Sequence, residues 1–415
     1  MARTLSSLAL LVLASACSSR ARCDEPPLAP LDRTPGFAVV LSDYASTAVA
    51  LLDGEGETIT EAWLDSGTRA SDVSPGLSGD VVPVDPPRPG TLALLERWNA
   101  DRLTLATLAN SELRQIDLRG DDPFGHSPNA QDVLAIDARH VLVARANPSF
   151  HPETPELARG NDVVVVDLEA GAILSRIDLE ADAQLEDGTI AYARPTSMVM
   201  LERGAHRRVV VGLQGLDESW RVSGPGAVSV VDPDARRREL TLPLEGLSGC
   251  HFARAVPGAP DRAMVLCTGD AFTPEVERRR EAGIVRLVLD QRGDVRAERV
   301  WRAAEHPEAP SPTTGLVPLD ASRAVFVSDP RADGGVDVLT QVDLDAGSTV
   351  VVLEAEASFV LGSGAFDPER GLLLVPDAAT RAVHRLDLRA GRVEPRDSLP
   401  LPSCRTLPPR EIRRL

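Results

Sequence analysis

The feature of this sequence that most restricts its fold is a short apolar segment that ends in aspartate and recurs along the chain. Each copy is rich in β-branched or aliphatic residues, as β-strands are, and a polar turn follows it. The copies are Val49–Asp53, Val163–Leu168, Val228–Asp232, Val285–Asp290, Leu339–Leu344 and Val383–Leu388, with a degenerate copy at Leu103–Leu108. Other apolar segments flank each copy, which predicts seven four-stranded units, one every ~45–65 residues. Only Pro274–Ala282 has the character of a helix.

The repeated segment resembles the third strand of the YVTN-type β-propeller repeat, which reads roughly V-x-V-I-D before a turn. The resemblance covers nearly the whole mature chain. It implies an all-β fold, a seven-bladed β-propeller of four-stranded antiparallel blades similar to the YncE-like and lactonase-like proteins. Propellers include enzymes, binding proteins and scaffolds, so the resemblance by itself predicts a fold more than a function. A pair of β-sandwiches is the alternative fold.

The two ends of the chain are expected to close the ring. Phe37–Leu41 has the character of a second strand of the first blade, and the tail around Cys404–Leu407 is predicted to supply the missing inner strand. Closure of this kind removes the sheet edge that an open ring would expose.

The first residues predict export. Arg3, the apolar run Leu8–Leu13 and the small residues Ala14–Ala16 form a signal peptide over residues 1–16. Leu13–Cys17 resembles the signal of bacterial lipoproteins, which implies lipidation of Cys17, and Ser18 is similar to lipoproteins sorted to the outer membrane of Gram-negative bacteria. The alternative is ordinary cleavage after Ala16. We therefore expect a lipid-anchored protein of the cell envelope, with a lipidated tether over residues 17–35 and one propeller over residues 36–415.

Export to an oxidising compartment makes the remaining cysteines candidates for disulfides. Cys23, Cys250, Cys267 and Cys404 allow three pairings. Cys250 and Cys267 are expected on consecutive antiparallel strands, close enough to be joined, and ring closure would bring Cys23 to Cys404. We predict both disulfides.

Charge and motifs exclude several functions. The chain has 62 acidic and 44 basic residues, a formal charge of −18, so we expect no nucleic-acid partner. All the basic residues are arginines, which excludes lysine-dependent catalysis. The histidines show no metal-binding spacing and no nucleophile motif is present, so the sequence favours a binding protein over an enzyme.

The long loops predict where binding occurs. In a propeller, the loops between blades and those between second and third strands share one face, and here nearly every insertion falls in these two classes. Because such one-sided loops are typical of a functional surface, we expect this face to bind protein or envelope partners. The residues expected on it are Asp43, Arg97, Trp98, Gln131, Asp132, Arg145, Asn147, Gln214, Trp220, His251, Asp270, Asp329 and Asp377.

Two alternatives concern the mouth of the central channel on this face. Its carboxylates, amides and hydroxyls have the chemistry to bind Ca²⁺ or another divalent cation, although aspartate at a strand end more often caps a turn. A metal-dependent lactonase is the alternative function, with Asn129, Asp132, Asn147 and His251 as the residues that would form its site.

Overall fold

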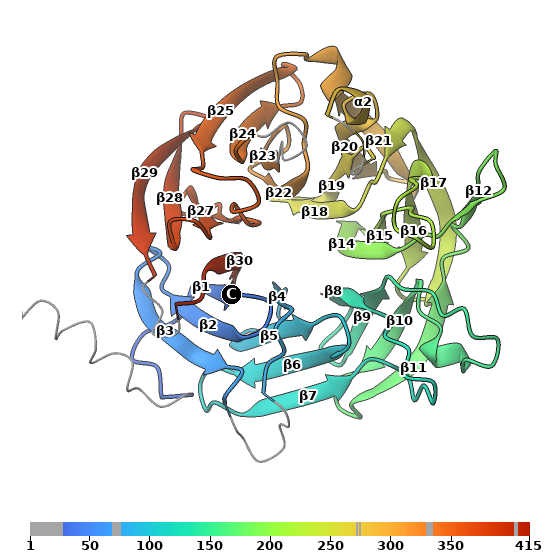
Figure 1. The fold of residues 1–415 in the computed structure, drawn as a ribbon, viewed down its shortest axis with the longest axis horizontal. Coiled ribbons are helices and arrows are strands. Elements are labelled where there is room, and N and C mark those ends of the chain that lie inside the picture. Colours follow the sequence, from blue (N-terminus) through green and yellow to red (C-terminus); the bar gives the residue numbers. More distant parts are fainter. Residues whose placement is uncertain (1–27, 69–75, 271–272, 274, 329–334, 402–405) are drawn as a thin grey trace, which may run out of the picture.

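The structure, a computed structural model, describes residues 28–68, 76–270, 273, 275–328, 335–401 and 406–415. Within these residues, seven four-stranded sheets stand around a central axis (Figure 1). Neighbouring strands of each sheet pair antiparallel, for example β1 with β2 and β27 with β28. The chain is therefore a seven-bladed β-propeller, as the repeat predicts, and the alternative of a β-sandwich pair is excluded.

The strands of each blade follow one another in sequence from the channel outward, except in blade 1. Blade 1 contains β30 (Pro409–Arg414), β1 (Phe37–Ser42), β2 (Thr47–Leu52) and β3 (Thr58–Asp65). Blade 2 contains β4 (Val81–Val84), β5 (Thr91–Glu96), β6 (Arg102–Thr107) and β7 (Leu113–Asp117), and blade 3 contains β8 (Ala130–Ala135), β9 (His140–Arg145), β10 (Asp162–Asp167) and β11 (Ala172–Asp178). Blade 4 contains β14 (Pro195–Arg203), β15 (His206–Leu213), β16 (Pro225–Asp232) and β17 (Arg237–Ser248).

The remaining blades keep the same order. Blade 5 contains β18 (Phe252–Val256), β19 (Ala259–Thr268), β20 (Ala282–Leu289) and β21 (Val295–Arg302). Blade 6 contains β22 (Thr314–Pro318), β23 (Arg323–Ser328), β24 (Val338–Asp343) and β25 (Ser348–Glu354), and blade 7 contains β26 (Ala365–Asp367), β27 (Leu372–Asp377), β28 (Ala382–Arg389) and β29 (Arg392–Pro400). Outside the blades lie the hairpin of β12 (Ala183–Gln184) and β13 (Ile190–Ala191), the helix α2 (Glu275–Arg278), and the short 3₁₀ helices η2 (Glu156–Ala158) and η3 (Ala303–Glu305).

The helix α2 lies inside the one segment that the sequence predicted to be helical. None of the helices in the described part of the chain has the length and apolar character that a membrane span requires.

The ring closes through the tail of the chain. β30 pairs antiparallel with β1 and is the innermost strand of blade 1, so β1 is the second strand, as predicted. The expected segment was wrong, because the closing strand is Pro409–Arg414 and not the residues around Cys404–Leu407. The charged residues of β30, Arg410, Glu411, Arg413 and Arg414, hid it from a search for apolar strands. Figure 1 shows this strand beside β1, on the inner rim of the ring.

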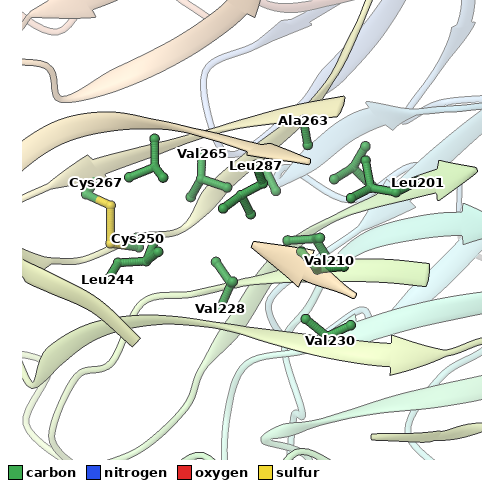
Figure 2. Close-up of a cluster of buried hydrophobic side chains, with 14 of the residues drawn as sticks. Leu201, Val210, Val228, Val230, Leu244, Cys250, Ala263, Val265, Cys267 and Leu287 are labelled. Carbon is green, nitrogen blue, oxygen red and sulfur yellow. A yellow bond between two sulfur atoms is a disulfide. The ribbon is translucent and has the colours of Figure 1, made fainter. Parts of the chain in front are cut away.

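Each interface between neighbouring blades holds its own apolar cluster, because a twisted four-stranded sheet has two faces to bury. One cluster joins blades 4 and 5 through Val210 and Val228 on one side and Val265 and Leu287 on the other (Figure 2). Others join blades 5 and 6 around Phe326 and blades 7 and 1 through residues of β27 and β1. Their aliphatic side chains are almost wholly buried, which explains why the strands read as continuous β-branched runs.

The predicted disulfide between Cys250 and Cys267 is present, at the edge of the cluster between blades 4 and 5 (Figure 2). Cys267 lies in β19. Cys250 precedes β18, and its backbone forms an isolated antiparallel β-bridge with Leu213 at the end of β15. The disulfide therefore ties the entry of blade 5 to its own second strand. Cys23 and Cys404 lie outside the described residues, so their pairing stays a prediction.

The recurring aspartate is explained by the turn that follows it. An oxygen of the Asp232 side chain accepts the backbone N–H groups of Asp234 and Ala235, both at 2.9 Å. Asp53, Asp167, Asp290 and Asp343 accept two backbone N–H groups each in the same way. The motif is therefore a turn cap that separates the third strand from the fourth.

The chain enters the propeller along the outside of blade 1. Leu28 donates its N–H to the carbonyl of Trp63 and accepts a hydrogen bond from the Ser111 hydroxyl, while Arg33 pairs with Asp53 at 2.6 Å. Residues 28–35 therefore contact blades 1 and 2. The signal peptide, Cys17 and the first part of the predicted tether lie outside the described residues, and their processing stays a prediction.

The loops differ in length between the two faces of the ring, as predicted. Connections between first and second strands and between third and fourth strands are short turns throughout the described chain, such as residues 257–258 and 390–391. Connections between blades and between second and third strands include residues 66–80, 118–129, 146–161, 179–194 and 214–224. We call the side that carries them the long-loop face.

Candidate functional site

A cavity of about 490 Å³ opens on the long-loop face and extends into the central channel. Inner strands of several blades line it, together with the loops that follow the second strands of blades 2, 3 and 4. The predicted binding-face residues that line this cavity are Arg97, Trp98, Gln131, Asp132, Gln214, Trp220 and His251. The sequence therefore placed these side chains, from four blades, at one site. Whether they bind a ligand stays a prediction.

The other predicted residues lie elsewhere. Asp43 caps its own turn by accepting the N–H groups of Ala45 and Ser46, and these hydrogen bonds lower the pKa of Asp43. Asp270 lies in the loop after β19, which does not line the channel cavity. Asp329 lies outside the described residues.

Three more of the predicted residues have structural partners. Arg145 is fully buried and forms two 2.8 Å hydrogen bonds with the equally buried Asp162. Asn147 accepts a hydrogen bond from Arg194 at 3.3 Å, which fixes the loop after β9 against blade 4. Asp377 is buried beside His384.

Tryptophan and arginine side chains frame the mouth of the cavity. Trp98 is 54% exposed, and Trp220 stacks against the Arg194 guanidinium at 3.7 Å from the ring centroid. Arg97 pairs with Asp80 at 2.6 Å. The mouth therefore offers two indole faces to a ligand, and the Arg194 contact holds one of them in place.

His251 lies at the cavity wall just before β18. Its backbone carbonyl accepts hydrogen bonds of 2.6 Å from the hydroxyls of Thr196 and Ser197, which attaches blade 5 to β14 of blade 4. Within the described residues, no hydrogen bond is formed by its imidazole nitrogens. Burial, and then the positive charge of Arg254, lower the pKa of His251 to about 4. The imidazole is therefore neutral at pH 7, and its surroundings disfavour its protonation.

Deeper in the channel lie charged residues that the sequence analysis missed, namely Asp85, Arg254, Glu411 and Arg413. Arg413 donates to Asp85 through both its Nε, at 2.6 Å, and a terminal nitrogen. Burial opposes the charge on both groups, but their mutual attraction outweighs it, so the pKa of Asp85 is lowered and that of Arg413 raised. Asp85 keeps 58% of its side chain exposed, and it lies in the short turn that follows β4.

Two carboxylic acids share this region of the channel and are harder to ionise. Burial raises the pKa of Glu411, despite the nearby Arg97 and Arg254. Burial also raises the pKa of Asp132, whose two oxygens accept the N–H groups of Val133 at 2.9 Å and Met198 at 2.7 Å. Asp132 therefore links blade 3 to blade 4 while it lines the cavity.

The sequence holds a signal for these missed residues, but it can be interpreted only once the fold is known. Arg254 lies in the middle of the short strand β18, and Glu411 and Arg413 lie two residues apart in β30. A charged residue within a strand is unremarkable in an exposed sheet, but an innermost propeller strand faces the channel. Charged residues at innermost-strand positions were the pattern that would have identified them.

The described part of the chain contains no cluster of side chains that would form a metal site. No set of three or more His, Cys, Asp or Glu side chains there is arranged to hold an ion. The predicted Ca²⁺ or other divalent cation at the channel mouth stays a prediction.

A serine, a histidine and an aspartate, the residue types of a catalytic triad, lie close together on blade 7, away from the channel. Ser398 and the Nδ1 atom of His384 are 2.8 Å apart, and the Nε2 atom of His384 is 3.1 Å from Asp377. His384 and Ser398 are a cross-strand pair of β28 and β29, near the outer edge of the blade. The set does not line the channel cavity, and a flat sheet surface does not enclose a substrate.

Comparison with known proteins supports the fold. No protein-family model matches the sequence, and no curated protein matches it in sequence. Among solved structures, a periplasmic gluconolactonase from Pseudomonas aeruginosa superposes with a TM-score of 0.55 at 15% identity, over 92% of this chain and 99% of that chain.

Two further solved structures have the same architecture. A hypothetical selenium-binding protein from Sulfolobus tokodaii superposes with a TM-score of 0.58 at 11% identity, over 94% of this chain and 97% of that one. A proposed 6-phosphogluconolactonase from Bacteroides uniformis superposes with a TM-score of 0.53 at 12% identity, over 92% of this chain and all of that one. At these identities the similarity shows a shared propeller fold.

Proposed function

We propose that this propeller hydrolyses a lactone of a small polar acid in the cavity at the mouth of its channel. The observation that carries the proposal is His251, a neutral imidazole at the wall of a concave, polar cavity of about 490 Å³. Solved propellers of this fold include a gluconolactonase, and for this reason a sugar lactone is the first substrate to test.

The proposed reaction uses side chains of this chain. His251 accepts a proton from a water molecule as the water oxygen bonds to the lactone carbonyl carbon. The carbonyl oxygen becomes an oxyanion, for which Gln214 and Arg97 are N–H donors in the same cavity. The ring C–O bond then breaks, and the leaving alkoxide takes the proton from His251. The product is the open hydroxy acid.

Hydrolysis of glucono-1,5-lactone, followed by acid release above the spontaneous rate, tests this proposal. We expect turnover by the wild type and a fall of about 10²–10⁴-fold in His251→Gln, the usual contribution of a general base. His206→Gln is the matched control, because His206 lies at the start of β15, on the short-turn face. Absence of turnover across five- and six-membered sugar lactones, or full activity of His251→Gln, would overturn the proposal.

A second candidate function is docking of a protein or envelope partner on the long-loop face. The observation that favours it is that the most exposed aromatic side chains in the described chain all lie on loops of this face. They are Tyr44, Trp98, Phe124, Phe150 and Phe359. Exposed aromatic residues are common at the centre of protein interfaces.

Cross-linking in intact cells, with and without the exposed aromatic residues, tests the docking function. We expect the double variant Phe124→Ser and Phe150→Ser to lose a specific cross-linked product. The control is Leu174→Ser with Leu240→Ser, two exposed residues on outer strands. Equal cross-linking by both variants would count against a partner on this face.

Attachment to the outer membrane through Cys17 is a separate proposal, supported by the similarity of Leu13–Cys17 to the lipoprotein signal. Mass spectrometry of the mature N-terminal peptide measures the lipid directly. We expect a lipidated Cys17 in the wild type and release of Cys17→Ala from the membrane fraction. An unmodified thiol at Cys17 would favour ordinary cleavage after Ala16.

A further inference from the structure

Among the described residues, three arginines line the channel cavity, and two of them have a carboxylate partner. Arg97 pairs with Asp80 at the mouth, and Arg413 pairs with Asp85 deeper in the channel. Arg254, which lines the same cavity, donates from one terminal nitrogen to the carbonyl of Ala253 at 3.0 Å. Within the described residues it forms no ion pair.

The acids near Arg254 are committed to other groups. Both oxygens of Asp132 accept backbone N–H groups, and Ser363 hydrogen-bonds to Glu411. Burial raises the pKa of each acid, and neither forms an ion pair with Arg254 within the described residues. The Arg254 guanidinium is therefore a half-buried cation at the wall of the cavity.

A guanidinium keeps its proton even where its surroundings oppose the positive charge. An anion bound beside it would therefore lower the electrostatic free energy of the site. Burial, and then the charge of Arg413, lower the pKa of Arg254, while the negative charges of Asp132, Asp85 and Glu411 partly offset them. An oxyanion at this position would be attracted by Arg254 and Arg413 together. The planar fork of a guanidinium matches a carboxylate or a phosphate, because each presents two oxygens in one plane.

We propose that Arg254, with Arg413 behind it, binds the carboxylate or phosphate group of a small organic acid in the channel cavity. The inference rests on the proposed function and names its substrate class, which is a lactone that carries an anionic group. The cavity has room for one such molecule, with its ring toward Trp98 and Trp220 and its anionic group toward Arg254.

The arrangement also links binding to the proposed base. The positive charge of Arg254 is one cause of the low pKa of His251, after burial. An anion on Arg254 would cancel part of that charge and make His251 a stronger base once the substrate is bound. The same contact would thus select the substrate and activate the site.

Calorimetric titration of the mature protein with non-reactive anions tests the site without any turnover. The probes are inorganic phosphate, gluconate and 6-phosphogluconate, with uncharged glucitol as the control ligand. We expect at least one anion to bind, at least tenfold more weakly to Arg254→Gln, and glucitol to bind no tighter than the anions. Arg389→Gln, an exposed arginine of β28, is the matched control and should bind as the wild type does.

The pattern of binding identifies the anionic group and separates the two proposals. Preference for phosphate and 6-phosphogluconate over gluconate assigns a phosphate, and the reverse assigns a carboxylate. His251→Gln should keep anion binding while it loses hydrolysis. Anion binding that depends on Arg254 without lactone turnover would leave the anion site standing and reject the proposed hydrolysis.

Two results would overturn the anion site itself. One is equal anion binding by the wild type and by an Arg254→Gln protein with an unchanged melting temperature. The other is lactone hydrolysis that Arg254→Gln leaves unchanged for charged and uncharged lactones alike, which would keep the hydrolase and reject this substrate class.

Discussion

The interfaces between blades and the central channel are built by opposite rules. Each interface is a buried apolar cluster, largely of valine, leucine and alanine side chains, formed by residues that recur from blade to blade. The channel is lined by the inner strands of the same blades, yet its arginines, acids and His251 belong to no repeat. Repetition therefore makes the ring, and departures from repetition mark the place where a ligand can be recognised.

Arg145 gives the first test of this division, because it reaches the end of a second strand but is part of the framework. It forms a bidentate ion pair with Asp162, and both side chains are completely buried. We expect Arg145→Ala to lower the free energy of unfolding by about 3 kcal/mol, because the buried Asp162 carboxylate loses two hydrogen bonds but keeps Arg176 at 2.7 Å. Urea denaturation measures this loss.

Arg389→Ala is the control for Arg145, since Arg389 pairs with Asp387 while its side chain is 70% exposed. An exposed pair contributes about 0–1 kcal/mol, so this variant should unfold almost as the wild type does. Similar losses in the two variants would contradict the division between framework and surface charges.

The disulfide is the second test, because it reinforces an interface that is already apolar. Cys250 and Cys267 are separated by 17 residues and are packed in the cluster between blades 4 and 5. Loop-closure entropy predicts that Cys250→Ala with Cys267→Ala lowers the free energy of unfolding by about 3 kcal/mol. The wild type under reducing conditions is the comparison, and no difference between oxidised and reduced protein would show that packing alone holds this interface.

How far the sequence predicts the molecule follows the same division. The aspartate-terminated strands predict the blades, their number and the side on which the long loops lie, because these features repeat. The closing strand was placed too early in the tail, since Glu411 and Arg413 give β30 no apolar pattern. Arg254 was missed for the same reason: its role depends on which strand is innermost, and that is a property of the ring.

The predicted site residues fall into two groups, according to whether the side chain reaches the channel or turns into a blade. Trp98, Gln214 and His251 reach the cavity because they lie where strands meet the long-loop face near the axis. Arg145 and Asp377 also end second strands, but their side chains turn into the blades and find buried partners. The sequence gives the end of a strand and leaves open which face of the sheet the side chain occupies.

The turn caps offer a smaller test of the repeat. Asp232 accepts two backbone N–H groups in the turn between β16 and β17. We expect Asp232→Ala to lower the free energy of unfolding by about 1–2 kcal/mol, the net value of two hydrogen bonds. Asp234→Ala is the control, because the Asp234 side chain is 67% exposed and pairs only at the surface with Arg207. An equal effect of the two substitutions would mean that the repeated aspartate is not kept for its cap.

The pH dependence of stability gives the smallest effect and concerns the channel directly. The pKa of His251 falls from the ordinary value of 6.5 to about 4, so the folded protein holds fewer protons at this site than the unfolded chain. Its contribution to stability is present above pH 6.5 and is lost as the pH falls from about 6.5 to about 4. Because the cavity that His251 lines is open to solvent, screening reduces the effect, and we expect a difference of about 1 kcal/mol. Wild type should therefore lose more stability than His251→Gln between pH 7 and pH 4.5, measured by urea denaturation.

Because the other titrating groups are common to both proteins, their effects cancel in this comparison. Parallel losses would show that His251 is not held neutral by its surroundings, and the proposed base would then lack its physical basis.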